Sequence, residues 1–387
     1  EHPKLCEDKA LKRYAYCAPQ YVPPRPDHLF RNDGGRFVEV TEAAGIVDKD
    51  GRGLGVLIVD LDGDGKPDIY VANDQSANFL FLNKGGMRFE EAGGPAGVAS
   101  SGDGIYQASM GIACGDVDGD GRPDLAVTNF YSEYTTLYQN RGGGVFTDAT
   151  SAFGVATPTK HRLGFGVALV DVNNDGRLDL ATANGHVDDF RPALPYQMPA
   201  QLLLGVGGGR MVDATAGAGA PWQVPRVARG LAAGDLDNDG RVDLVILSHD
   251  GPLAYFHNRP AAGSWLTLGL EATAGHREAI GARVVVTAGG RRLSAWRVGG
   301  GSYQSACDPR LHFGLGGATS VESVEVTWPS GRVDRYGALA AEAGYLIREA
   351  DRAARPLPGF TRPARPSAAA DSTSSHPFID AARRTDS

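Results

Sequence analysis

Short runs of apolar side chains, many of them β-branched, recur along the chain between acidic and glycine-rich segments. Apolar runs of about four to eight residues bounded by turn residues are typical of β-strands. We therefore predict a strand at four equivalent places: residues 69–72, 125–128, 180–183 and 244–247. A glycine-flanked apolar run comes before each of them, at residues 55–59, 111–114, 166–170 and 230–233.

A third pattern lies between these pairs of strands. It reads as a strand, an Asn/Gly turn and a second strand, which is the signature of a β-hairpin. Its copies are residues 29–41, 79–91, 137–150 and 202–215. Each unit then holds about four short antiparallel strands, the content of one propeller blade. The pattern predicts an all-β repeat protein, a β-propeller.

An acidic loop of nine residues joins the first two strands of every unit. The first copy reads Asp60-Leu61-Asp62-Gly63-Asp64-Gly65-Lys66-Pro67-Asp68, with oxygen side chains at positions 1, 3, 5 and 9. Crowded carboxylates repel one another unless a hard cation sits among them, and calcium takes oxygen ligands. The glycine at position 6 allows the sharp turn, because it reaches φ > 0 without a Cβ clash.

These positions define the predicted calcium ligands, with position 7 contributing its backbone carbonyl. Asn173 replaces aspartate at position 3 of the third loop, and we expect a slightly weaker site there. The full set is Asp60, Asp62, Asp64, Lys66 and Asp68; Asp116, Asp118, Asp120, Arg122 and Asp124; Asp171, Asn173, Asp175, Arg177 and Asp179; Asp235, Asp237, Asp239, Arg241 and Asp243.

The four loops differ from an EF-hand, which shares their first six positions. An EF-hand needs Glu at position 12 and flanking helices, whereas position 12 holds Val71, Val127, Thr182 or Ile246, and strands follow. A single Asp/Gly loop is equally well interpreted as a solvated turn. Four copies in one frame favour calcium, so we predict about four Ca²⁺ ions.

Charge supports this interpretation. The loops hold 15 of the 46 acidic residues, and four Ca²⁺ would bring the formal net charge of −8 to about zero. Lys and Arg are scattered without an aromatic-interleaved basic patch, so nucleic-acid binding is not supported. No stretch approaches the length of about 18 apolar residues that a membrane span requires.

The repeats resemble FG-GAP/VCBS repeats, as in the integrin α-chain propeller, and residues 261–350 resemble the ASPIC/UnbV domain of the cartilage acidic protein 1-like and UnbV-like family. The residues that carry the resemblance are Ala108-Ser109-Met110-Gly111, Asn184-Gly185-His186, Trp265-Leu266-Thr267-Leu268, Ala279-Ile280-Gly281-Ala282-Arg283-Val284, Gly299-Gly300-Gly301-Ser302-Tyr303, Leu311-His312-Phe313-Gly314-Leu315-Gly316 and Trp328-Pro329-Ser330-Gly331. The resemblance implies a propeller followed by a small β-sandwich-like domain. Propellers of this family have seven blades, whereas this chain shows four calcium-loop units and starts at Glu1. We therefore infer that a signal peptide and upstream blades precede Glu1. Alternatively, the four blades close with the terminal domain, or they remain an open arc.

The predicted organisation has four parts: a Pro-rich N-terminal segment (1–25), the propeller repeats (26–260), the ASPIC/UnbV-like domain (261–350) and a disordered tail (351–387). Cys6 and Cys17 enclose a short loop and are expected to form a disulfide. Whether Cys114 and Cys307 pair is left open. Disulfide use and oxygen-only calcium sites favour a secreted protein, extracellular or periplasmic.

Candidate catalytic residues are few. His186, which is followed by Asp188 and Asp189, could be a metal ligand or a general base, but we favour a turn histidine that bonds the backbone. His312 is flanked by apolar strand residues and is expected to have a packing role. The glycine runs 207–209 and 299–301 are interpreted as hairpin turns. Trp222, Trp265, Trp296 and Trp328 are expected to fill cores rather than stack on sugars.

The sequence therefore predicts a non-catalytic calcium-binding propeller that binds or adheres to an extracellular protein or glycan. The alternative is an enzyme or accessory protein of a secondary-metabolite pathway, with a site at the propeller axis that gathers His186, Asp188 and Tyr196. The sequence leaves the oligomeric state open.

Overall fold

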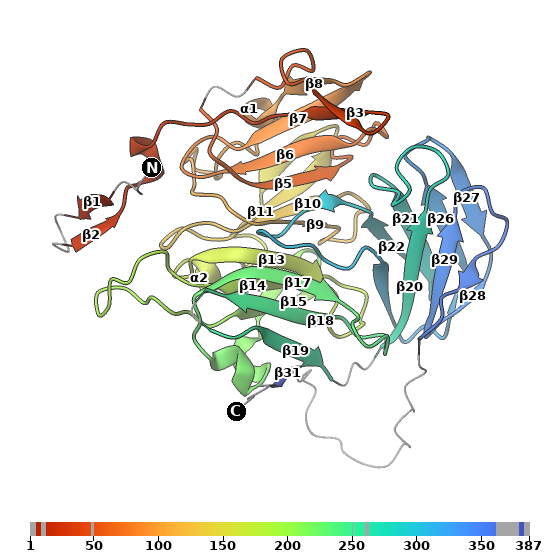
Figure 1. Ribbon diagram of the computed structural model, residues 1–387. Helices are drawn as coiled ribbons and strands as arrows, with labels where there is room; N and C mark the ends of the chain where they lie inside the picture. Colours follow the sequence, from red (N-terminus) through yellow and green to blue (C-terminus); the bar gives the residue numbers. More distant parts are fainter. Residues whose placement is uncertain are drawn as a thin grey trace.

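The computed structural model describes residues 5–8, 13–47, 50–249, 251–259, 263–360 and 379–382. Nearly all of its elements are strands (Figure 1). Four successive antiparallel sheets form the repeat region, and two further sheets form a C-terminal sandwich beside it (Figure 1). The all-β repeat architecture predicted from the sequence is confirmed.

Each repeat sheet is a meander whose strands are hydrogen-bonded in chain order, with neighbouring strands antiparallel. Strand pairs that are close in sequence find each other through short turns, which is why the local apolar pattern predicted them. The strands are β5 (Gly53–Val59), β6 (Asp68–Asn73), β7 (Phe79–Gly85) and β8 (Arg88–Glu91); β9 (Ile112–Gly115), β10 (Asp124–Val127), β11 (Thr136–Gly142) and β12 (Val145–Asp148); β13 (Gly164–Val170), β14 (Asp179–Asn184), β15 (Gln201–Gly207) and β16 (Arg210–Asp213); β17 (Ala228–Gly234), β18 (Asp243–Ser248), β19 (Ala254–Asn258) and β31 (Ile379–Ala382).

The second strands of the repeats are almost fully buried because they lie in the middle of each sheet, and their apolar side chains pack between neighbouring sheets. The tryptophan prediction holds, since Trp222, Trp265, Trp296 and Trp328 are all at most 7% exposed. Trp222 lies between the third and fourth sheets with Leu202, Leu244 and Phe256. Burial of this kind is the main stabilising contribution to a repeat stack.

Smaller elements flank the repeats. A hairpin of β3 (Phe30–Asp33) and β4 (Arg36–Glu39) precedes the first sheet, and β1 (Leu5–Asp8) pairs with β2 (Arg13–Tyr16). The predicted disulfide between Cys6 and Cys17 is present, whereas Cys114 and Cys307 are free thiols. The helices are one turn long: α1 (Gly93–Ala96), α2 (Ala156–Thr159), and the 3₁₀ turns η1 (Pro19–Tyr21), η2 (Thr215–Gly217) and η3 (Ala220–Gln223). No helix in the described part of the chain has the length and apolar character that crossing a membrane requires.

The C-terminal sandwich encloses its own core. Leu268, Val286, Phe313, Val324 and Ile347 come from both sheets and meet between them. One sheet is ordered β24–β20–β29–β30 and the other β22–β21–β26–β27, with a small pair β25–β28. Their bounds are β20 (Ser264–Glu271), β21 (Arg283–Ala288), β22 (Arg291–Trp296), β24 (Leu311–Gly316), β25 (Ser320–Val321), β26 (Ser323–Thr327), β27 (Val333–Tyr336), β28 (Leu339–Ala340), β29 (Ala343–Arg348) and β30 (Arg355–Pro356).

One segment of the C-terminal region leaves the sandwich and meets the first strand of every repeat sheet. Strand β23 (Gly299–Gly300) pairs with β5, so the prediction of a hairpin turn at 299–301 is wrong. Ser302 follows with a left-handed φ of 54° and is 5% exposed. Its backbone exchanges hydrogen bonds with Ile112, and its Oγ accepts from the Val167 N–H and donates to the Leu231 carbonyl. We call residues 299–308 the axial segment.

The structure describes only part of the predicted disordered tail, residues 351–387. Strand β30 pairs with β29 and the backbone of β31 pairs with β19. Residues 361–378 and 383–387 lie outside the described residues, so the predicted disorder there is not addressed.

Candidate metal centres

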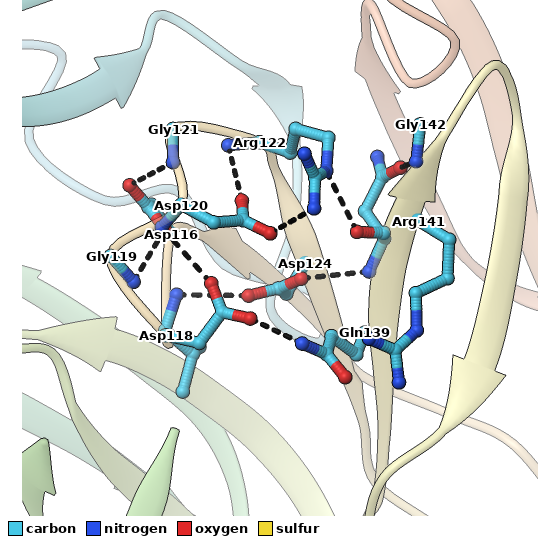
Figure 2. A network of polar contacts seen from close by, with 12 residues as sticks. Asp116, Asp118, Gly119, Asp120, Gly121, Arg122, Asp124, Gln139, Arg141 and Gly142 are labelled. Atoms are coloured by element: carbon cyan, nitrogen blue, oxygen red, sulfur yellow. Dashed lines mark hydrogen bonds and ion pairs between the residues drawn. The ribbon is translucent and has the colours of Figure 1, made fainter. Parts of the chain in front are cut away.

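The nine-residue acidic loops connect the first and second strand of each repeat sheet. Position 9 is the first residue of the second strand in all four copies: Asp68, Asp124, Asp179 and Asp243. Figure 2 shows the second loop, in which the side chains of Asp116, Asp118 and Asp124 turn toward one another. The same local sequence therefore places the same set of carboxylates at one end of every sheet.

Position 1 organises the turn. In the second loop the Asp116 carboxylate accepts the N–H groups of Gly119 and Gly121, each at 2.9 Å. Both glycines are left-handed, with φ of 82° and 86°. The prediction of a positive φ at position 6 is confirmed in every loop, since Gly65, Gly176 and Gly240 have φ of 86°, 79° and 84°. Position 4 is also left-handed in each copy, which the sequence reasoning missed.

Position 9 ties the loop to the third strand. Both oxygens of the Asp124 carboxylate are used: one accepts the N–H of Val117 at 2.9 Å, and the other accepts that of Asn140 in β11 at 2.8 Å. The other three loops repeat this arrangement. Loop, second strand and third strand are thereby held in one register before any ion binds.

The predicted ligands converge in part. Oxygens of positions 1, 3 and 9 lie within 4.8 Å of one another in the first loop (Asp60, Asp62, Asp68) and in the second (Asp116, Asp118, Asp124). Position 5 instead pairs with the basic side chain of position 7. These ion pairs are Asp64–Lys66, Asp120–Arg122, Asp175–Arg177 and Asp239–Arg241. Coordination by position 5 and by the position 7 carbonyl stays a prediction.

Two residues near the loops were missed by sequence reasoning. The Gln139 amide in β11 donates to the Asp118 carboxylate, as Figure 2 shows, and His257 in β19 lies 3.2 Å from the Asp237 carboxylate. Each immediately precedes an asparagine, Asn140 or Asn258, whose N–H binds position 9. The asparagine could have pointed to Gln139 and His257 in the sequence, because in both loops the residue before it contacts the position 3 carboxylate.

Burial raises the pKa of the position 1 and position 9 carboxyl groups above the usual range. The pKa reaches about 6 for Asp116 and about 7 for Asp124. Two weaker effects on the pKa of Asp116 and Asp124 oppose each other: backbone N–H donors lower it, and neighbouring carboxylates raise it. The pKa is also raised to about 7 for Asp68 and Asp171 and to about 6 for Asp235, and it is raised for Asp60, Asp179 and Asp243.

These raised pKa values bear on whether a cation fits. The protein's own donors do not compensate the buried negative charge, and a divalent cation at the convergence point would. Carboxylate oxygens around a flexible glycine turn match the preference of Ca²⁺. The residues of the fourth loop match calcium less well, because Asp237 and Asp239 group with the His257 imidazole, and nitrogen is not a usual calcium ligand.

The residues of the enzyme hypothesis do not line the cavity between the repeats and the sandwich. A cavity of about 550 Å³ lies between the repeats and the sandwich, lined by residues such as Leu57, Val167 and Phe313 rather than by His186 or Tyr196. His186 is 2% exposed and its ring contacts aromatic rings, among them that of Phe130, with 5.3 Å between the ring centroids. Its Nδ1 accepts the Asp188 N–H at 3.1 Å, as expected of a turn histidine.

Comparison with family models decides what kind of chain this is. The FG-GAP-like repeat matches residues 20–71, 60–127 and 116–182, and the ASPIC and UnbV model matches residues 272–354. This is an FG-GAP-like repeat protein with an ASPIC and UnbV domain. Three of its acidic loops lie within the matched repeats. The fourth, residues 235–243, lies beyond them and has the same turn.

Three curated relatives of this FG-GAP-like repeat protein share one name. Cartilage acidic protein 1 of Xenopus tropicalis is 30% identical over 294 residues, which cover 73% of this chain and 42% of that protein. The Homo sapiens protein is 28% identical over 318 residues, covering 80% and 45%, and the Mus musculus protein 28% over 361 residues, covering 76% and 54%. The chain spans about half the length of the curated relatives it matches.

Among the solved structures that are similar to part of the FG-GAP-like repeat protein is the following one. It concerns recognition of non-reducing terminal N-acetylglucosamine by an Agrocybe aegerita lectin, with 18% identity and a TM-score of 0.35 over 61% of this chain and 58% of that one. A score this low carries no argument about fold or ligand.

Proposed function

We propose that this chain is a non-catalytic, secreted calcium-binding scaffold whose repeat loops are held by about four Ca²⁺ ions and whose loop surfaces bind an extracellular protein or glycan. One observation carries the proposal: oxygens of Asp116, Asp118 and Asp124 lie within 4.8 Å of one another, and the first loop repeats the cluster. Bound calcium would neutralise these carboxylates and fix the turns.

The proposed compartment follows from two features. The Cys6–Cys17 disulfide suits an oxidising environment, extracellular or periplasmic. Short oxygen-only loops suit an exterior in which calcium is abundant. The similarity to cartilage acidic protein 1 agrees with this compartment.

Metal removal tests the proposal. Excess EDTA should lower the melting temperature substantially, and added CaCl₂ should restore it, because the buried carboxylates repel one another without a cation. A variant with Asp60→Asn and Asp116→Asn should lose part of this calcium-dependent shift. Asp103→Asn changes an exposed carboxylate outside the loops and should keep all of it.

A melting temperature that EDTA leaves unchanged would contradict calcium as a structural ion. The binding part of the proposal is tested separately, on glycan and protein arrays with calcium and with EDTA. Binding that is equally strong in both would show that the loops are not the ligand surface.

A further inference from the structure

Arginines of the C-terminal sandwich bind the backbone of three of the acidic loops. The Arg283 guanidinium donates to the Gly121 carbonyl of the second loop at 2.8 Å. Arg291 donates to both Asp175 and Gly176 of the third loop, at 2.8 and 2.7 Å. Arg310 donates to the Asp235 carbonyl of the fourth loop at 2.7 Å.

These contacts leave the proposed metal ligands free. The carbonyls that accept from the arginines belong to loop positions 1, 5 and 6, whereas the carbonyl predicted to bind calcium belongs to position 7. Position 6 has the left-handed conformation that wraps the loop, for example φ of 86° at Gly121. The direction of the accepting carbonyls is therefore set by the same turn that gathers the carboxylates.

The third and fourth loops are bound more closely than the others, through an asparagine at position 4. The Asn174 Oδ1 lies 2.7 Å from Nε2 of His312, its Nδ2 donates to the Gly240 carbonyl at 2.9 Å, and its carbonyl accepts from the Gly316 N–H at 2.8 Å. Asn238 accepts from Arg310 at 2.5 Å.

The first and second loops differ at this position. They have Gly63 and Gly119 there, and a Cβ at either would have nothing within 4 Å. The asparagines of the other two loops therefore serve contact with the sandwich and, for Asn174, with the fourth loop, rather than the turn itself, since glycine makes the same turn.

Packing brings the sandwich directly onto a predicted ligand. A Cβ on Gly314 in β24 would lie 1.9 Å from Oδ2 of Asp171, and a Cβ on Gly240 would lie 1.9 Å from the Trp265 ring. Trp265 is 2% exposed. In addition to the arginine hydrogen bonds, this close packing therefore joins the third and fourth loops to the sandwich.

We infer that docking of the C-terminal sandwich and calcium binding in the third and fourth loops are coupled: calcium fixes the loop surface that the sandwich binds, and the docked sandwich raises the calcium affinity of those two loops. The inference rests on the proposed function. Coupling between two sites is reciprocal, so both directions can be measured.

The test compares the chain with a variant carrying Asn174→Gly and Asn238→Gly, which gives these loops the glycine of the first two. Calcium titration by calorimetry should show two sites weakened by about fivefold or more, the lower range of typical site coupling. Gly104→Asn, which adds an asparagine at an exposed left-handed position outside the acidic loops with nothing within 4 Å, is the matched control and should leave all affinities unchanged.

Hydrogen exchange of the full chain gives the second readout. The N–H groups of Ser302, Asp308 and Gly316 donate across the interface, to Ile112, Ala233 and Asn174. Their exchange should become several-fold faster in EDTA and in the double variant. Exchange in β21 and β26, which pair inside the sandwich, should not change.

Calcium binding with unchanged affinity in the double variant, together with cross-interface exchange that calcium does not affect, would overturn the coupling while leaving the proposed function intact. Absence of calcium binding by the unaltered chain would overturn both. If the double variant does not fold, Arg291→Gln, at an exposed residue that binds only the third loop, carries the same two measurements, and one weakened calcium site is then expected.

Discussion

Position 4 separates the four loops into two pairs. Gly63 and Gly119 stand where space is open, while Asn174 and Asn238 lie under the C-terminal sandwich. Asparagine tolerates a left-handed φ better than most residues, so it satisfies the turn and also provides side-chain hydrogen bonds. One residue position thus combines a local backbone requirement with a long-range contact.

Position 6 allows backbone strain to be separated from steric overlap. Gly65→Ala introduces a Cβ at a left-handed φ of 86° with nothing within 4 Å, and should cost about 1–2 kcal/mol of unfolding free energy. Gly240→Ala has a similar φ of 84° but meets the Trp265 ring, so a cost of about 3–5 kcal/mol is expected. Urea denaturation in calcium measures both; equal costs would mean that the Trp265 contact is absent in solution.

At the scale of elements, local patterns predicted the repeats well. The apolar runs, the acidic loops and the Asn/Gly hairpins are each contained in a few residues, so β6, β10, β14 and β18 were found at their observed places. Spacing within the loops likewise identified positions 1, 3 and 9, which converge in the first two loops.

Elements formed by distant residues were not predictable in this way. His257 reaches the fourth loop only because β19 pairs beside β18. The axial segment has a glycine-rich sequence that reads locally as a turn, and its pairing with β5 joins residues far apart in the chain. No local pattern encodes these contacts, since they depend on how whole sheets pack.

Strand β24 gives the loop interface a pH dependence. Burial lowers the pKa of His312 to about 4, so the native protein keeps the ring neutral. The unfolded chain takes up this proton first, with a pKa near 6.5. Stability is therefore lost as the pH falls from about 6.5 toward 4.

The free energy of unfolding in calcium, measured at several pH values for the native chain and for His312→Gln, isolates this contribution. The native chain should lose more stability than the variant between about pH 6.5 and pH 4, because loop carboxylates titrate equally in both. Parallel curves would show that His312 is not held neutral.

At the scale of the whole molecule, the axial segment joins the repeats to one another. Ser302 uses its backbone on β9 and its hydroxyl on β13 and β17, and the preceding strand pairs with β5. All four sheets therefore share one point of attachment that belongs to the C-terminal region.

Ser302→Ala should destabilise the protein by about 2 kcal/mol, since it leaves the buried Val167 N–H and Leu231 carbonyl without their partner. Ser320→Ala, at an exposed residue of β25, is the matched control and should have little effect. The midpoint of denaturant unfolding measures both changes. A midpoint for Ser302→Ala equal to that of the control would argue against the axial attachment.

The axial segment also has a consequence for the order of events during synthesis. The first three repeat sheets form, apart from β23, from neighbouring residues and can fold as they emerge from the ribosome, one after another. The residues that fasten β5, β9, β13 and β17 together emerge only after β19 of the fourth sheet. Until then β5 has an unpaired edge, which is a site of misassociation in nascent β proteins. The axial segment thus completes the assembly of strands that were made before it.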